Sequence, residues 1–216
     1  LYVHKFSPTL SRPYAFRNCL FEDNYGGSGN NGGAMYADGA VRLDIEACRF
    51  RGNHAEQGAA MLVASGAILT CDETVFQGNV ASLGGAALLI EEGVTATFTR
   101  SNFTGNTVTS PTSSATAGGV FVVLDDSHLV LEGCYIEGNS AGNGGVLRLD
   151  TSSTASTVTA TDCWFVGNTA KSFSGDGGVA VVTTEADDQV SLVFTDCYIV
   201  ANTAALHGGA FDVDGN

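Results

Sequence analysis

Carboxylates are the most numerous charged side chains in this sequence. The chain carries 23 acidic against 9 basic residues, and Glu92, Asp126 and Asp150 recur at equivalent places. Hard cations such as calcium bind clustered oxygen ligands of this kind. No Asp-x-Asp-x-Gly loop accompanies these residues, however. We therefore expect a solvated acidic edge with no metal or other cofactor, and a calcium site at Glu92, Asp126 and Asp150 is the alternative.

Hydrolysis of a glycosidic bond is the reaction that paired carboxylates would support. It needs two carboxyl groups about 5–9.5 Å apart, one on each side of the bond. In one strand-like segment, the outward positions nine and eleven residues before a recurring Asn hold mostly Thr, Val, Ile and Ser. At these two positions no acids fall in successive repeats. We therefore expect no catalytic residues, and the chain is predicted not to be an enzyme.

Six cysteines could form disulfides or bind a metal. Five of them stand five residues before a recurring Asn: Cys19, Cys48, Cys134, Cys163 and Cys197. Thr74 and Ser101 replace Cys in two repeats, so the position requires a small side chain and favours free buried thiols. Disulfides between repeats are the alternative, because a strand spacing of ~4.8 Å lies within the Cα range of a disulfide.

Aromatic side chains predict a ligand-binding surface. The position four residues before the recurring Asn must point outward, and three successive repeats place Tyr135, Trp164 and Tyr198 there. Tyr and Trp are enriched at binding hot spots, and three rings on adjacent strands would span ~10 Å. A glycan lying along the axis or a partner protein could stack on them, although stacking that only stabilises the sheet is the alternative. The same column holds Asn102 of a possible glycosylation sequon, Asn102-Phe103-Thr104.

These residues keep their spacing because the chain is built from repeats. An Asn with Phe or Ile three residues before it recurs at Asn24, Asn53, Asn79, Asn106, Asn139, Asn168 and Asn202. A pair of glycines follows, as at Gly32-Gly33, Gly84-Gly85 and Gly144-Gly145, with Gly58-Ala59 as a degenerate copy. A fixed period of 20 to 50 residues indicates a solenoid. Residues 1–216 are therefore predicted to form one solenoid.

Each repeat contains three segments with the alternation of a β-strand. Apolar residues stand twelve, ten and eight residues before the Asn, as in Val41, Leu43 and Ile45, and again five and three before it. A third alternating segment follows the glycines. A period of two indicates half-buried strands. The sequence thus predicts an all-β, right-handed parallel β-helix with three strands per rung of about 26 residues, in which the asparagines bond one another at a corner.

The outward positions of the third segment are also apolar. In successive repeats they are predicted to hold Leu62, Leu88 and Val122. Contiguous exposed apolar patches mark interaction surfaces. We therefore expect this face to pack on another protein chain or another domain of the same assembly.

Composition and charge argue against several classes of protein. A formal net charge of −14 argues against nucleic acid as a partner, because phosphates are bound by Lys and Arg. No apolar run approaches the ~18 residues of a membrane span. Both ends fall within a rung and neither resembles the atypical repeat that caps a solenoid. We therefore expect a segment of a longer protein.

Two tetrapeptide motifs recur along nearly all of the chain. They are Gly-Gly-Ala-hydrophobic, as at Gly32–Met35, and Phe-x-x-Asn, as at Phe50–Asn53. These repeats resemble those of chlamydial polymorphic outer-membrane proteins and related secreted or surface β-helices of bacteria and algae. The resemblance implies a structural or adhesive segment of a large extracellular or cell-surface protein. The alternatives are a carbohydrate-active enzyme whose catalytic rungs lie outside this segment, and a subunit of an extracellular filament or appendage.

Overall fold

Parallel β-strands form all the regular structure in the described part of the chain. The computed structural model describes residues 1–4, 13–27, 31–109, 118–151, 155–171, 175–184 and 190–215. The strands make four sheets of eight, seven, six and seven strands, with parallel pairing between neighbours. Among these residues no helix has the length and apolar character needed to cross a membrane.

The four sheets are named A to D. Sheet A comprises β1 (Tyr2–His4), β4 (Met35–Asp38), β8 (Met61–Val63), β12 (Leu88–Ile90), β16 (Phe121–Leu124), β20 (Leu147–Thr151), β24 (Ala180–Thr184) and β28 (Phe211–Gly215). Sheet B comprises β2 (Tyr14–Arg17), β5 (Arg42–Glu46), β9 (Ile68–Asp72), β13 (Thr95–Thr99), β17 (His128–Glu132), β21 (Thr157–Thr161) and β25 (Ser191–Thr195). Sheet C comprises β3 (Leu20–Glu22), β6 (Arg49–Arg51), β10 (Val75–Gln77), β14 (Asn102–Thr104), β18 (Tyr135–Glu137), β22 (Trp164–Val166) and β26 (Tyr198–Val200). Sheet D comprises β7 (His54–Gln57), β11 (Val80–Gly84), β15 (Thr107–Val108), β19 (Ser140–Ala141), β23 (Thr169–Ala170) and β27 (Thr203–Ala204).

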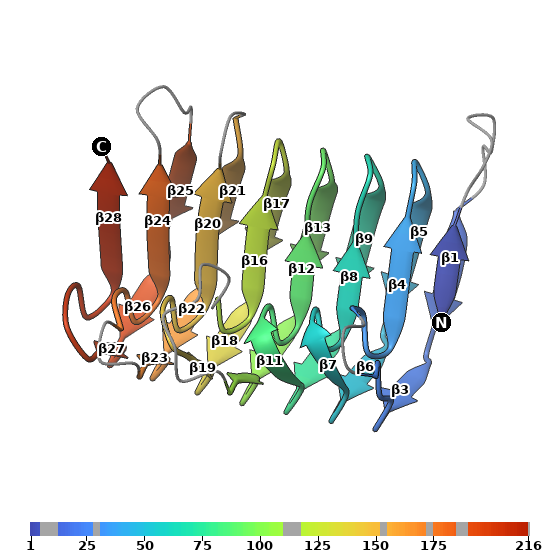
Figure 1. Ribbon diagram of the computed structural model, residues 1–216, viewed down its shortest axis with the longest axis horizontal. Helices are drawn as coiled ribbons and strands as arrows, with labels where there is room; N and C mark the ends of the chain where they lie inside the picture. The colour runs from blue at the N-terminus through green and yellow to red at the C-terminus, as the bar shows by residue number, and fades with distance from the viewer. Residues whose placement is uncertain are drawn as a thin grey trace.

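The rungs stack along the long axis of the molecule, and the two ends of the chain lie at opposite ends of the stack (Figure 1). Each complete rung runs through sheets B, C, D and A in turn, which confirms the predicted parallel β-helix. The prediction of three strands per rung is wrong, because sheet D adds a fourth. Its strands are as short as two residues, so alternation could not reveal them. Asparagines of successive rungs lie 26 to 34 residues apart, so about 26 describes only the shortest rung.

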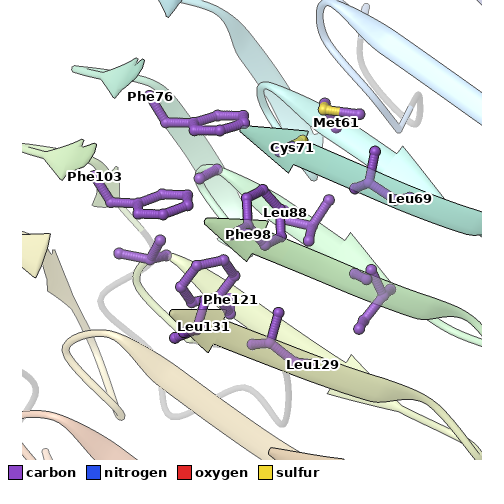
Figure 2. Packing of buried hydrophobic residues seen from close by; sticks show 14 of the residues in the cluster. Met61, Leu69, Cys71, Phe76, Leu88, Phe98, Phe103, Phe121, Leu129 and Leu131 are labelled. Atoms are coloured by element: carbon purple, nitrogen blue, oxygen red, sulfur yellow. The ribbon is translucent and has the colours of Figure 1, made fainter. Parts of the chain in front are cut away.

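Inward-facing side chains fill the interior as columns. The predicted inward positions Val41, Leu43 and Ile45 are buried. Phe76 stacks between Phe50 and Phe103 with ring-centroid distances of 4.9 and 4.8 Å, and Figure 2 shows the parallel rings of Phe76 and Phe103. Each rung therefore buries its apolar surface against the next, at about 25 cal/mol per Å².

The recurring asparagines form a continuous ladder of hydrogen bonds. The side-chain amide of each donates to the side-chain oxygen of the next over 2.8–3.0 Å, from Asn24 to Asn202. The same amide also donates to the backbone oxygen of an earlier Phe or Ile, as Asn106 does to Phe76. The predicted bonding between asparagines is thus confirmed, and buried amides such as that of Asn106 have partners on both atoms.

The cysteine column is a second ladder, and it explains why Cys, Ser and Thr share one position. Cys163 Sγ accepts a hydrogen bond from the backbone N–H of Cys134 over 3.4 Å and donates to the Thr161 carbonyl oxygen over 3.2 Å. The Ser101 hydroxyl makes equivalent bonds to Thr74 N–H and the Thr99 carbonyl oxygen. All six cysteines are free. The position therefore requires a small side chain that both accepts and donates a hydrogen bond, and small size alone is not enough.

Substitutions at Cys163 should separate these two requirements. Cys163→Ala removes the acceptor of the buried Cys134 N–H, and we expect it to lower the free energy of unfolding by about 1–3 kcal/mol. Cys163→Ser keeps a group that accepts and donates hydrogen bonds, so it should lower the free energy of unfolding by less. Urea unfolding of both variants measures the difference, and a Ser variant less stable than the Ala variant would refute this account of the column.

Candidate ligand-binding face

The outer face of sheet C presents the aromatic column that the sequence predicts. Tyr135, Trp164 and Tyr198 are successive partners in register on β18, β22 and β26. They point outward because their neighbours along each strand are inward, as Cys163 and Phe165 are around Trp164. Trp164 and Tyr198 are 45% and 55% exposed, and their rings stack at 4.1 Å with an interplanar angle of 10°. The predicted placement of the three aromatic residues is thus confirmed.

A second outward column on sheet C extends this surface. Val166 and Val200 are partners in register beside the stacked pair, and Val200 is half exposed. Glu137 precedes them on β18. The aromatic end of the face is therefore apolar at its centre, with the carboxylates of Glu137, Asp162 and Asp196 at its edges.

The other end of the same face is basic and hollowed. A hollow of about 440 Å³ lies over β3, β6 and β10, and Leu20, Arg49, Arg51 and Gln77 are among its lining residues. Arg51 forms an ion pair with Glu22 at 3.2 Å. Six of the chain's nine Lys and Arg residues precede residue 52, against five of its 23 acidic residues, so this end carries almost none of the chain's net negative charge. This clustering is visible in the sequence, but only the register shows that it shares a face with the aromatic residues.

Asn102 lies midway along this face. Its partners in register are Val75 on one side and Tyr135 on the other, and its side chain is exposed as predicted. Glycosylation of the sequon Asn102-Phe103-Thr104 stays a prediction.

The acidic edge does not gather the three carboxylates that could have held calcium. Asp150 pairs in register with Leu124, not with Asp126, and forms an ion pair with Arg148 at 2.9 Å. Among the described residues, no three His, Cys, Asp or Glu side chains form a group that could hold a metal. Glu92, Asp126 and Asp150 therefore do not form the calcium site left open as an alternative.

Like charges do meet at this edge in another combination. Burial raises the pKa of the Glu91 carboxyl above its usual value, and the nearby carboxylates of Glu92, Asp125 and Asp38 raise it further. Burial and like charge at this edge therefore disfavour the ionised form of Glu91 relative to a solvated carboxyl.

The predicted packing face on sheet A is not an exposed surface. Leu88 pairs in register with Met61 and Phe121 and belongs to the main core. Leu62 and Val122 do face outward, but both are 0% exposed. They form a separate buried cluster with Ala64 and Leu89, against which Tyr36 and Leu124 pack. The expectation that Leu62, Leu88 and Val122 meet another chain or domain is therefore wrong.

The misplacement of Leu88 has a backbone cause. In most of the other rungs the first glycine of the pair takes a positive φ three residues before the strand, as Gly144 does at +56° before Leu147. At Gly84-Gly85 the second glycine takes this role, with a φ of +61°. Matching the two glycines by sequence alone therefore shifts β12 by one residue, which exchanges its inward and outward side chains.

One pair of stacked acids escaped the sequence analysis. Glu46 and Asp72 are partners in register on β5 and β9, at the end of the outer face of sheet B. Arg17 binds Glu46 over 2.9 Å, and Arg100 binds Asp72. The sequence carries a signal for this pair, because Glu46 and Asp72 each stand seven residues before the Asn of successive repeats. A general acid in glycoside hydrolysis is a buried carboxyl that retains its proton, whereas the Glu46 side chain is 57% exposed and paired with a cation.

Comparison with known proteins identifies the family from most of the chain. The model of the family described as a right handed beta helix region matches residues 16–216. Searches of curated proteins and of solved structures gave no match. The match agrees with the parallel strand order of the four sheets and confirms the predicted right hand of the helix. The chain belongs to the right-handed β-helix family.

Proposed function

We propose that this chain is a structural and adhesive β-helix segment of an extracellular or cell-surface protein, and that it binds a glycan along the outer face of sheet C. The observation that carries the proposal is the exposed, stacked pair of Trp164 and Tyr198, with Tyr135 one strand away. An adhesive role needs a rigid support and a recognition surface, and the sheet provides a support for these side chains.

The chemistry of the aromatic column favours a sugar ligand. The rings of Trp164 and Tyr198 each cover one face of the other, so the pair presents apolar ring edges and outer faces, and the apolar face of a sugar ring can pack against them without leaving hydroxyl groups buried and unpaired. The rungs repeat at ~4.8 Å, so the three residues offer a row of contacts along the axis. The hydroxyl groups of the same ligand can reach Asn102 and Thr104, which lie on the adjacent strand.

The proposed location rests on the motifs. The Gly-Gly-Ala-hydrophobic and Phe-x-x-Asn repeats resemble those of chlamydial polymorphic outer-membrane proteins, which are surface proteins. We infer binding without catalysis, because Glu46 and Asp72 are each engaged by an arginine.

Replacing the exposed aromatic residues tests the proposal. We expect Trp164→Ser, alone and with Tyr198→Ser, to weaken binding by about 30-fold or more, because loss of a hot-spot aromatic costs about 2 kcal/mol. The measurement is a titration with oligosaccharides of four to six sugars that the unmodified chain binds, alongside thermal unfolding. Val193→Ser is the matched control, since Val193 is 44% exposed but lies on sheet B.

The outcomes separate a binding role from a structural one. Weakened binding with little change in the melting temperature supports the proposal. Unchanged binding with lowered stability would mean that the aromatic column only stabilises the sheet. Equal loss of binding in Val193→Ser would place the ligand elsewhere and contradict the proposal.

A further inference from the structure

We propose that the glycan recognised by sheet C carries a single acidic residue at one end, which Arg49 binds, while its neutral sugars lie over Tyr135, Trp164 and Tyr198. This inference rests on the proposed function, because it specifies the ligand of the same face. It states which end of the ligand lies at which end of sheet C, and it gives a binding role to Arg49, which lies at the opposite end of the sheet from Trp164 and Tyr198.

Arg49 and the aromatic residues belong to one uninterrupted column. Pairing in register runs from Arg49 through Val75 and Asn102 to Tyr135, and then to Trp164. Four steps of ~4.8 Å separate Arg49 from Trp164, or ~19 Å. An extended oligosaccharide of several sugars can therefore contact both ends of the column at once. The residues between them, Val75, Asn102 and Tyr135, are uncharged.

Arg49 is the cation of this face that is available to a ligand. Within the described part of the chain it forms no ion pair, whereas Arg51 beside it is held by Glu22. Both arginines line the hollow of about 440 Å³, which is large enough for an acidic sugar. A guanidinium group binds a carboxylate through two parallel hydrogen bonds, so Arg suits this role better than Lys.

The charges at the opposite end set the direction of the ligand. Exposed Asp162 and Asp196 stand two residues before Trp164 and Tyr198, and Glu137 lies on the adjacent strand. These carboxylates repel an acidic group from the aromatic end. At physiological salt, charges separated by more than about 8 Å are largely screened. The three carboxylates therefore do not cancel the attraction between Arg49 and an acidic group of the ligand. The face therefore selects one acid at the Arg49 end, and a polymer with an acid on every second sugar would be repelled.

The test compares one oligosaccharide with and without its acidic end. The probes are a hexasaccharide that ends in sialic acid and the same oligosaccharide after removal of the sialic acid. We expect the unmodified chain to bind the sialylated form about 10-fold more tightly, as one charge-assisted hydrogen-bonded contact predicts. Arg49→Gln should bind both forms equally, with the affinity that the unmodified chain has for the neutral form. Arg42→Gln, an exposed arginine on sheet B, is the matched control and should retain the preference.

Three results would overturn the inference. Equal binding of both forms by the unmodified chain would overturn it, while loss of that binding in Trp164→Ser would leave the proposed function standing. Loss of the preference in Arg42→Gln as well would show a general effect of charge and no site at Arg49. Binding of neither form would contradict the proposed function and this inference together. Thermal unfolding of Arg49→Gln confirms that the variant is folded.

Discussion

Replacing Asn106 with Ala should lower the free energy of unfolding by about 3 kcal/mol, because the change leaves two buried hydrogen-bond donors without an acceptor. The side-chain oxygen of Asn106 accepts one hydrogen bond from the backbone N–H of Asn79 and one from its side-chain amide, at 3.1 and 2.9 Å. Its own amide donates to Asn139 and to the backbone oxygen of Phe76. Asn79 is itself fully buried, so water cannot replace the lost acceptor.

The same rung offers a matched control for this prediction. Asn102 is exposed on sheet C four residues earlier, and Asn102→Ala should change stability by less than about 0.5 kcal/mol. Urea unfolding of the two variants gives the comparison. If Asn106→Ala were no less stable than Asn102→Ala, the ladder would be a consequence of the fold and not a support for it.

The columns could be predicted from the sequence wherever spacing alone fixes the direction of a side chain. In each Phe-x-x-Asn motif the Phe stands three residues before the Asn. This constant spacing was enough to predict the buried phenylalanine column and the hydrogen bonds between asparagines. The aromatic column followed from the same count, because Trp164 stands between two inward residues. Sheet D did not follow, since pairs such as Ser140–Ala141 are too short to show alternation.

The predictions of side-chain direction were wrong where a shift of one residue in the strand register exchanges inward and outward positions. The turn before β12 uses Gly85 instead of Gly84, and this places Leu88 inside and Leu89 outside. Two adjacent glycines are equivalent in the sequence, and only the positive φ distinguishes them. The same sensitivity applies to Asp150, which lies within a strand while Asp126 lies in the turn after one.

The basic end of the candidate site was hidden for a different reason. Arg49 belongs to the same outward column as the aromatic residues, yet it is 115 positions before Trp164 in the chain. Their proximity is a property of the stacking, in which rungs of 26 to 34 residues each advance the chain by one strand spacing. Ligand sites in such a solenoid are therefore found by comparing residues at the same position in successive rungs. A cluster of charged residues along the sequence marks only one end of such a site.

Phe76→Ala should produce the largest loss of stability, about 3–5 kcal/mol, because it removes a ring from the centre of the aromatic stack. Phe76 is fully buried between Phe50 and Phe103, and its ring also meets Phe98 edge to face at 5.7 Å. The inward position is fixed by the strand, so neighbouring backbones cannot close the cavity without breaking their pairing with β10. Val75→Ala, on the outer face of the same strand, is the control and should cost less than about 1 kcal/mol. Urea and thermal unfolding measure both variants, and equal losses would contradict a stabilising role for the stacked phenylalanine rings.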